Sequence, residues 1–399
     1  MCRHGGVCYT KRVCRRSSIE FACEQMNRSP FHVAFVGVIL VALGLCGSFM
    51  GCRQQTPQQV VEQSTLPEVH RNAKHPERYF VQFDTMGTYA RFEVVSSDRD
   101  KATAMLHAAY KEAQMVHVLM STYRENSDIS RLNKRGAEEA VEVSSRTLEL
   151  LKMAKDLSKR TGGAFEPTYA PLRELWRKAQ REDRVPSQQQ LANTQKLVGS
   201  EDVILEDGKA RLARQGMEID LGGIAKGYGI DQATETLLSR GAKEAMVDIG
   251  GDMRVVGRAG DDKPWKIGIR CPEGAEEYCP IYLALEDIAV ATSGDYARGY
   301  VIDGKRYSHI IDPRTGKPVP NVPSVTVIAQ DAATADALAT GITVMGSEKA
   351  MEMVESMKGV ECLLLVRNEQ GKVEKYASSG FSNFMWRENN GGTQTGDSS

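Results

Sequence analysis

The sequence predicts an α+β protein in which mixed or antiparallel sheets pack against helices. Two observations favour this class. Segments with strand character outnumber the helices and do not alternate strictly with them, as they would in a doubly wound sheet. Two Asp-Gly pairs, Asp207-Gly208 and Asp303-Gly304, each join two such segments and indicate antiparallel hairpins. The 399 residues suffice for one large or two modest domains with a sizeable core.

The charge distribution separates a basic N-terminus from a mildly acidic body. Residues 1–51 carry six Lys or Arg and two Glu, in a chain with 51 basic and 52 acidic side chains. The remaining residues therefore carry 45 basic and 50 acidic side chains. Such a body has no electrostatic footprint for nucleic acid, so we expect no nucleic-acid partner.

An apolar run at residues 31–50 ends at Gly51-Cys52 and is followed at once by polar residues. Its length alone would permit a transmembrane helix. A small residue before a cysteine at the end of such a run resembles a bacterial lipoprotein signal. We therefore expect residues 1–51 to be a signal region, cleaved before Cys52, which then carries a lipid anchor. The protein would lie on the periplasmic or extracytoplasmic face of a bacterial cell membrane.

Composition sets the remaining boundaries of the chain. The segment before the apolar run is long and Cys-rich for a signal peptide, so we suggest that translation starts at Met26. Native peptides from upstream of Met26 would contradict this. Residues 52–77 are polar and without periodicity, and they are expected to form a flexible tether. The folded domain should span residues 78–385, and residues 386–399 should form a disordered tail.

Local signals place the elements of the first half of the domain. Ser144 and Ser187 are typical helix N-caps. Pro171 suits the first turn of a helix, and Gly162-Gly163 ends one. The expected elements are strands 79–83 and 89–95, a helix at 101–120, a polar loop at 121–124 and 127–133, helices 144–160 and 172–180, and a helix after Ser187.

In the second half, one helix begins after Gly222-Gly223 and closes at Gly241. Its apolar residues recur at helical spacing. The expected elements are a hairpin at 203–212, strands 217–221, 245–256, 265–270 and 281–292, a hairpin at 300–307, strand 325–329, helices 331–344 and 348–357, and strands 362–366 and 372–377.

The turn at Gly222-Gly223 is the first candidate for a binding site. A strand, paired glycines and a helix N-terminus together suit an anion, since glycine admits a ligand close to the backbone. Asp220 and Lys226 flank the turn, a mixture that fits a phosphate with a metal ion. The plainer interpretation is a tight β-turn-α connection. The spacing matches neither the dinucleotide fingerprint nor the P-loop.

Two further polar clusters lie beside glycines or on one helix face. Asp336 and Thr340, four residues apart, can point at one hard cation such as Mg²⁺, or simply cap and pack the helix. His309, in the segment 308–316, can act as a general base, or it is a hydrogen-bonded structural residue. Tyr123 and Trp176 can stack on an aromatic ligand, although aromatic residues at such positions are usually core.

Cys271 and Cys279 bracket a polar loop in the body of the chain. They form a local disulfide in an oxidising compartment, or they stay reduced. Seven residues between two cysteines is a poor spacing for a zinc site.

A set of short stretches, taken together and in this order, resembles the ApbE family of FAD:protein FMN transferases. The resemblance covers roughly residues 79–366. The stretches are Thr85–Thr88, Ser121–Arg124, Thr161–Thr168 with Pro171–Trp176, Asp220–Asp231, Gly250–Asp252, Ser293–Tyr296, Arg306–Gly316 and Ala335–Thr340.

The resemblance implies a Mg²⁺-dependent enzyme with its FAD site in a cleft between sub-domains. Such enzymes split the FAD pyrophosphate, attach FMN through a phosphoester to a threonine of a membrane redox-complex subunit, and release AMP. The resemblance implies an FAD site lined by Met86, Tyr123, Ala164, Phe165, Glu166, Asp220, Lys226 and Ile311. It also implies a metal site formed by the Gly223 carbonyl, Asp336 and Thr340 with Ala339 beside them, and His309 as base.

Two positions depart from the family pattern. Glu166 stands where aspartate is common, and Ala339 has no side-chain ligand where some members place a carboxylate.

Two other functions fit the same residues. An FAD pyrophosphatase would use water as acceptor and make FMN and AMP. A non-catalytic flavin-binding lipoprotein would retain FAD unchanged. A thiamine-related role, once attributed to the family, has no chemical support in these residues.

Overall fold

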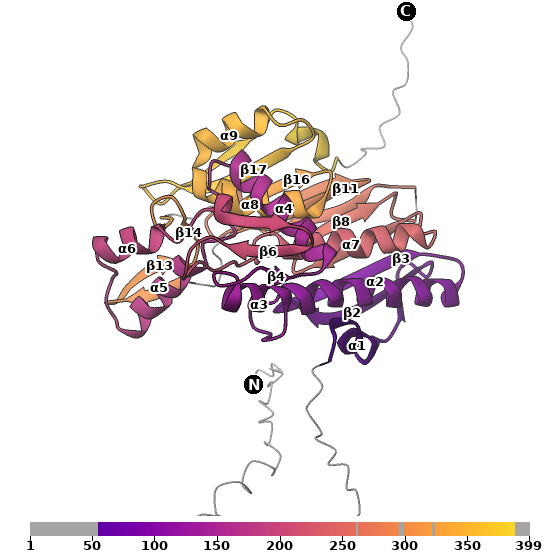
Figure 1. Ribbon diagram of the computed structural model, residues 1–399. Helices are drawn as coiled ribbons and strands as arrows, with labels where there is room; N and C mark the ends of the chain where they lie inside the picture. Colours follow the sequence, from indigo (N-terminus) through magenta and orange to yellow (C-terminus); the bar gives the residue numbers. More distant parts are fainter. Residues whose placement is uncertain (1–54, 261, 295–298, 321–323, 388–399) are drawn as a thin grey trace, which may run out of the picture. The chain divides into compact units, whose positions relative to one another are not determined.

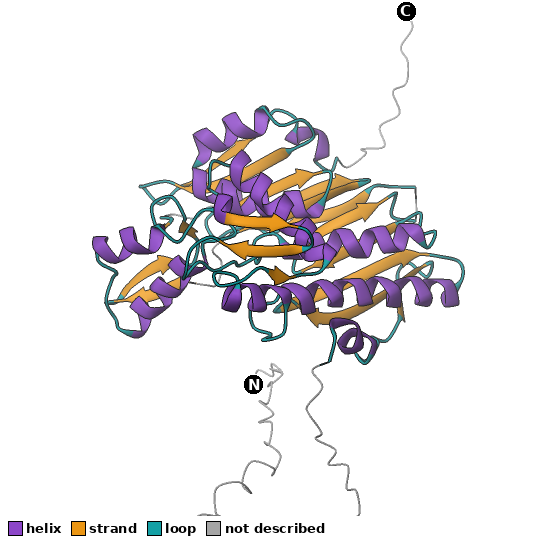
Figure 2. Ribbon diagram, in the orientation of Figure 1, coloured by secondary structure: helices purple, strands orange, loops and turns teal. Residues whose placement is uncertain are grey.

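The computed structural model describes residues 55–260, 262–294, 299–320 and 324–387, and a nine-stranded sheet organises them (Figures 1 and 2). Every neighbouring pair in this sheet is antiparallel. Its strands, in spatial order, are β1 (His70–Arg71), β2 (Arg78–Thr85), β3 (Thr88–Val95), β7 (Ala245–Ile249), β8 (Asp252–Val256), β11 (Ile288–Ser293), β16 (Ser324–Ala329), β17 (Glu361–Arg367) and β18 (Val373–Ala377). The predicted α+β class is confirmed.

Three helices lie side by side on one face of this sheet (Figure 1): α2 (Arg99–Met120), α7 (Ala225–Ser239) and α8 (Ala332–Met345). α2 packs on β2 and β3, α7 on β7 and β8, and α8 on β11 and β16. Because side chains alternate between the faces of a strand, Leu364 joins the core beneath the helices while Leu363 faces the opposite side. There Leu363 belongs to a second core that includes the hairpin of β9 (Trp265–Ile269) and β10 (Ile281–Leu285).

The remaining elements lie outside the main sheet and its three helices. The helices are α1 (Pro57–Glu62), α3 (Asp128–Arg135), α4 (Ser145–Arg160), α5 (Ala170–Arg181), α6 (Gln188–Gln195) and α9 (Ser347–Glu355). The strands are β4 (Val141–Glu142), β5 (Val203–Glu206), β6 (Lys209–Leu212), β12 (Gly299–Ile302), β13 (Lys305–Ser308), β14 (Ile311–Asp312) and β15 (Lys317–Pro318).

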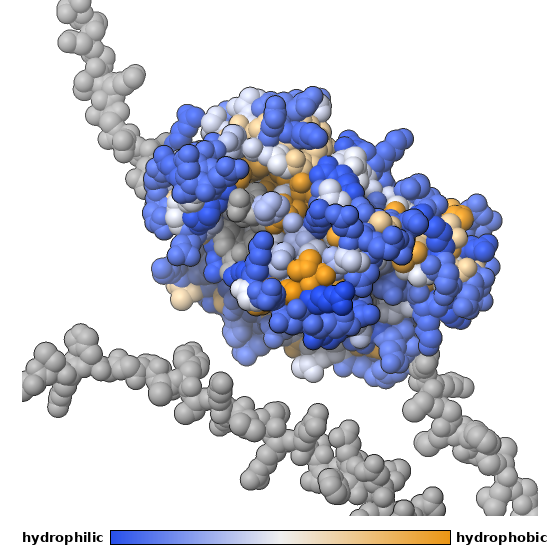
Figure 3. Space-filling view, turned by 90° about the vertical axis from the view of Figure 1, so that its left-hand side faces the viewer, coloured by the Kyte–Doolittle hydropathy of each residue, from blue (hydrophilic) through white to orange (hydrophobic). Residues whose placement is uncertain are grey.

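A small lobe made of α5, α6, β12 and β13 has its own core around Trp176. The Trp176 ring lies 6.3 Å from the ring of Tyr300 and 5.4 Å from that of Tyr307, centroid to centroid. Trp176 is therefore a core residue, as the plainer interpretation of an aromatic residue at this position predicts. The face of the molecule that carries this lobe is mostly hydrophilic, with apolar residues near its middle (Figure 3).

The local signals for hairpins and helix ends are confirmed. Asp207-Gly208 and Asp303-Gly304 all have positive φ, which two-residue hairpin turns with a matching right-handed twist require. Ser144 accepts a hydrogen bond from the backbone N–H of Thr147. Ser187 forms a capping box with Gln190, and Gly241 ends α7 with a φ of 90°.

Three predicted strands are wrong: two of them are each divided into two strands, and one does not form. Residues 245–256 and 281–292 each form two strands, broken at Gly250-Gly251 and at Asp287, whose φ values are positive. Residues 217–221 form no strand, although Met217, Ile219 and Leu221 are buried in alternation. The backbone of Ile219, at the centre of this segment, bonds to a side chain instead: Asn133 accepts from the Ile219 N–H at 2.7 Å and donates to its carbonyl at 2.8 Å.

The predicted polar loop at 127–133 is helix α3. Ser127 caps it by accepting a hydrogen bond from the Ser130 N–H at 2.9 Å. Ile129 and Leu132, three residues apart, are both fully buried. Two apolar side chains on one face of a short polar segment are enough to anchor a helix on the core.

Part of the predicted tether at 52–77 is ordered. α1 has a capping box at Thr56, and β1 adds an edge strand to the main sheet. Val61 and Val69 are buried, and Tyr110 of α2 donates a hydrogen bond to the Thr65 carbonyl at 3.2 Å. This segment is therefore packed on the domain from residue 57 onward.

The signal region, Met26 and Cys52 lie outside the described residues, as does the tail from residue 388. None of the helices that the structure describes is both long and apolar enough to cross a membrane. Cys271 and Cys279 form the local disulfide, with their Cα atoms 6.5 Å apart.

Candidate functional site

The turn before α7 is held in place by Asp220. The Asp220 side chain accepts a hydrogen bond from the Gly222 N–H at 2.8 Å and forms an ion pair with Arg173 of α5. Its own N–H donates to the Pro167 carbonyl at 2.8 Å. The carboxylate is nearly buried, at 9% exposure. Asp220 therefore joins the glycine turn to the small lobe and to the loop after α4.

Gly223 lies against α8 and the loop after α4. A β-carbon at position 223 would lie 3.1 Å from Thr340 Oγ1 and 3.4 Å from a ring carbon of Phe165. At Gly341, a β-carbon would lie 3.2 Å from Cβ of Phe165. The structure thus brings together Phe165, which the family resemblance assigns to the FAD site, and Gly223 and Thr340, which it assigns to the metal site.

Lys226, in the first turn of α7, lies between two buried carboxylates. Its Nζ is 2.9 Å from Asp336 Oδ1 of α8 and also donates a hydrogen bond to Asp252 of β8. The other oxygen of Asp336 accepts from the Gly227 N–H at 3.1 Å. Asp252 accepts in addition from the Thr292 N–H at 2.9 Å.

Burial and charge compete in this cluster. Burial acts to lower the pKa of Lys226, but the carboxylates of Asp252 and Asp336 outweigh it, so the pKa is raised and the lysine stays charged. Burial raises the pKa of Asp252 to about 6 although Lys226 acts against it. The cluster therefore presents one fixed positive charge between two carboxylates.

Asp252 is a site residue to which the sequence gives no role. Only the stretch Gly250-Gly251-Asp252 marks it, as one of the motifs of the resemblance. The partner of its carboxylate is 26 positions earlier in the chain, so no local pattern connects the two residues.

The residues expected to hold a metal offer oxygen atoms of the right kind. Asp336 and Thr340 lie on one face of α8, and Gly223 is in contact with Thr340. A carboxylate, a hydroxyl and a carbonyl suit a hard cation such as Mg²⁺. Ala339 is buried, and its carbonyl accepts from the Thr343 hydroxyl at 2.7 Å. Among the described residues, no three His, Cys, Asp or Glu side chains gather as a metal site.

Glu166 uses its carboxylate within the protein. It accepts from the Ser158 hydroxyl at 2.7 Å, from the Thr168 hydroxyl at 2.7 Å and N–H at 3.0 Å, and from the Ser200 N–H at 3.3 Å. The side chain thus fixes the loop that carries Ala164 and Phe165. Its contact with FAD stays a prediction.

Met86 lies beside α7, and Tyr123 lies beside α5. Met86 has a positive φ in the hairpin between β2 and β3, and its N–H donates to His117 Nδ1 at 3.2 Å. Its side chain ends beside Gly229 of α7. Tyr123 is 81% exposed, with its hydroxyl 3.5 Å from the Arg177 guanidinium. Tyr123 is thus a surface residue, unlike the buried Trp176, and its contact with FAD stays a prediction.

The segment that contains His309 connects the small lobe to α8. Ile311 is buried in the core around Trp176, and Arg314 donates to the Val344 carbonyl near the end of α8 at 3.2 Å. His309 lies between β13 and β14 and is half-buried. Asp295 and Tyr296 of the Ser293–Tyr296 stretch lie outside the described residues. The role of His309 as base stays a prediction.

A cleft of about 470 Å³ lies elsewhere, between the end of α4, the start of α8 and the turn after α9. None of the predicted site residues lines it.

Comparison with solved structures identifies the class of protein. The chain aligns with the flavin transferase ApbE from Vibrio cholerae at 35% identity and a TM-score of 0.68, over 77% of this chain and 99% of that one. It aligns with the ApbE protein from Thermotoga maritima at 36% identity and a TM-score of 0.69, over 78% and 100%. The fold is that of a flavin transferase.

Comparison of sequences gives the family. The ApbE family model matches residues 86–364, more than half of the chain. An FAD:protein FMN transferase of Vibrio cholerae is 36% identical over 78% of this chain and 94% of its own length, and one of Treponema pallidum is 32% identical over 73% and 86%. The chain belongs to the ApbE family.

Proposed function

We propose that the protein is a Mg²⁺-dependent FAD:protein FMN transferase that releases AMP. Membership of the ApbE family makes it an enzyme of the flavin transferase class, and its relatives carry the name of this activity. The observation that carries the proposal is the convergence of Gly223, Lys226, Asp336 and Thr340 at the start of α7. Glycine backbone, a half-buried ammonium group and oxygen ligands are the parts that a pyrophosphate with a cation requires.

The residues of the cluster have distinct tasks in this proposal. Gly222-Gly223 lets the pyrophosphate approach the backbone, and Lys226 brings a positive charge to it. Asp336, Thr340 and the Gly223 carbonyl would hold Mg²⁺. When bound, the cation would neutralise charge on the transferred and leaving phosphates.

The transfer step exchanges one bond to phosphorus for another. The threonine oxygen of the acceptor forms a bond to the FMN phosphorus while the phosphoanhydride bond to AMP breaks. AMP leaves with the electron pair of that bond. His309 takes the proton of the threonine hydroxyl, whose pKa is too high for attack without a base.

We further propose that the acceptor is a subunit of a membrane redox complex and that a lipid on Cys52 anchors the enzyme at the extracytoplasmic face. The apolar run ending at Gly51-Cys52 supports the anchor. The Cys271–Cys279 disulfide agrees with an oxidising compartment.

The test is incubation of the full chain, in detergent, with FAD, Mg²⁺ and a candidate acceptor domain, followed by intact-mass measurement and an AMP assay. We expect the acceptor to gain one FMN mass, with equimolar AMP, and the gain to vanish when the acceptor threonine is replaced. AMP and free FMN without an adduct on any acceptor tested would indicate the pyrophosphatase. Bound FAD that stays intact in Mg²⁺ would indicate the carrier.

A further inference from the structure

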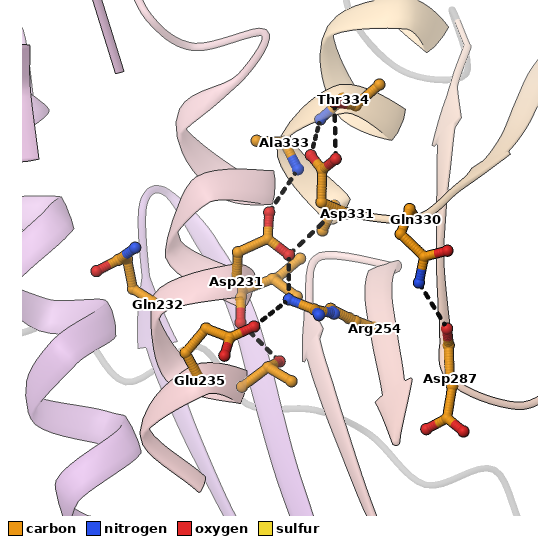
Figure 4. A network of polar contacts seen from close by, with 12 residues as sticks. Asp231, Gln232, Glu235, Arg254, Asp287, Gln330, Asp331, Ala333 and Thr334 are labelled. Carbon is orange, nitrogen blue, oxygen red and sulfur yellow. Dashed lines mark hydrogen bonds and ion pairs between the residues drawn. The ribbon is translucent and has the colours of Figure 1, made fainter. Parts of the chain in front are cut away.

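α7 and α8 each place a carboxylate at the N-terminus of the other. Asp231 of α7 accepts from the N–H groups of Ala332 and Ala333, both at 2.9 Å, and these residues begin α8 (Figure 4). Asp336 of α8 accepts in return from the N–H of Gly227, in the first turn of α7, at 3.1 Å. The first N–H groups of a helix have no partner within it and carry a partial positive charge, so each pairing is favourable.

The two helices touch backbone to backbone between these pairings. A β-carbon at Gly227 would lie 2.1 Å from the Ala332 carbonyl oxygen. Gly227 and Asp231, four residues apart, lie on the same face of α7. The contact therefore fixes α8 along and around its axis, because no side chain separates the helices there.

Asp231 does more than cap α8, since α8 has a cap of its own. Asp331 accepts from the Thr334 N–H at 2.7 Å and from the Thr334 hydroxyl at 2.9 Å. Asp231 accepts hydrogen bonds from the two N–H groups before Thr334, those of Ala332 and Ala333. Arg254 of β8 forms ion pairs with Asp231 at 3.1 Å and with Glu235 at 2.9 Å, so Asp231 is also linked to the main sheet (Figure 4).

We propose that Asp231 is a positioning residue that sets α8 on α7, so that Asp336 meets Lys226 and Thr340 meets Gly223. The inference rests on the proposed function, in which Asp336 and Thr340 hold Mg²⁺. Residues that orient metal ligands typically change metal affinity about 10–100-fold when they are replaced.

The test compares Asp231→Ala with Asp331→Ala in the full chain in detergent. Both variants remove one carboxylate from the N-terminus of α8, and only the first removes a link to α7. Mg²⁺ affinity is measured by calorimetry with Mg²⁺ alone, and thermal unfolding checks that both variants fold. We expect Mg²⁺ binding to weaken about 10–100-fold in Asp231→Ala and to change little in Asp331→Ala. Asp231→Asn, which keeps one acceptor oxygen, should lie between and replaces the alanine variant if that one does not fold.

A second readout does not depend on the metal. Hydrogen exchange of the Gly227 amide reports whether Asp336 still accepts its hydrogen bond. We expect faster exchange at Gly227 in Asp231→Ala and wild-type exchange in Asp331→Ala. Equal effects of both variants, on Mg²⁺ or on Gly227, would reduce Asp231 to an ordinary cap and overturn the inference. A folded wild-type protein that binds no Mg²⁺ would contradict the proposed function instead, while the exchange data would still decide the role of Asp231.

Discussion

At the scale of single residues, the site is a compact arrangement of charges around Lys226. One ammonium group lies between Asp252 and Asp336, and a backbone N–H shares Asp336 with it. Such a group is costly to bury unless it is paired, and here each partner is itself hydrogen-bonded. Loss of any one member would therefore leave the remaining charged groups with fewer partners.

Replacing the proposed metal carboxylate should abolish metal-dependent turnover. In Asp336→Ala, Lys226 keeps Asp252 as partner, so we expect the protein to fold while AMP release falls to background. AMP release at millimolar Mg²⁺ is the measurement. Asp156→Ala, on the exposed surface of α4, removes an equal charge and serves as control. Wild-type turnover in Asp336→Ala would contradict the assignment of Asp336 to the metal.

Removing the proposed base should slow the chemistry and leave binding intact. We expect His309→Ala to lower turnover about 10²–10⁴-fold, the usual contribution of a general base, with unchanged FAD affinity. Turnover and FAD binding are measured on the same preparation. His107→Ala is a suitable control, because His107 of α2 hydrogen-bonds the Pro67 carbonyl, in the packing of the N-terminal segment. An unchanged rate would remove His309 from the mechanism.

At the scale of elements, the contact of α7 with α8 is made possible by glycine. Two glycines of α7 face neighbours closely, but the neighbours differ. At Gly227 the atom nearest to an added β-carbon is backbone, the Ala332 carbonyl oxygen. At Gly229 it is the flexible end of the Met86 side chain, which would lie 2.8 Å from an added β-carbon. The backbone contact at Gly227 cannot make room for an added methyl group, whereas the Met86 side chain beside Gly229 can.

This difference predicts different effects on stability for two alanine substitutions. Gly227→Ala forces α7 from α8 and should cost about 1–3 kcal/mol of unfolding free energy or more. Gly229→Ala displaces only a methyl group and gains up to about 1 kcal/mol of helix propensity, so it should be nearly neutral. Denaturant unfolding of both variants is the measurement. Equal stability of the two would show that the helices are not in rigid contact at Gly227.

At the scale of the whole molecule, buried carboxylates make stability depend on pH. Burial raises the pKa of Asp231 to about 6, against the hydrogen bonds from Ala332 and Ala333 and the charge of Arg254, which lower it, while the charge of Asp331 adds to the rise. The folded protein therefore binds this proton more tightly than the unfolded chain does. The resulting stabilisation is present below the unfolded pKa near 4 and is lost as pH rises through about 6.

The prediction is that stability falls between pH 4 and pH 7 and that Asp231→Asn flattens part of this fall. The part due to Asp231 is on the order of 3 kcal/mol. Asp252, with its pKa also raised to about 6, contributes a fall of the same sign that the variant retains. Denaturant unfolding across this pH range is the measurement. An identical pH slope in wild type and variant would contradict the shifted titration of Asp231.

Features that depend on neighbours in the chain could be predicted from the amino-acid sequence. Both Asp-Gly hairpins, the caps at Ser144 and Ser187 and the end of α7 at Gly241 follow from turn and cap chemistry that acts over a few residues. The order of short motifs likewise indicated the ApbE family, which the comparisons confirm. These features needed no knowledge of distant contacts.

Features whose partners lie far apart in the chain became visible only in the folded structure. Asn133 takes both backbone hydrogen bonds of Ile219, in the middle of the strand expected at residues 217–221. Lys226 meets Asp252 and Asp336, 26 and 110 positions away, and Asp231 meets Ala332 across 101 positions. The physical reason is that a buried polar group must find its partner in space, and the chain encodes that meeting through the packing of α7, α8 and the sheet rather than through any local pattern.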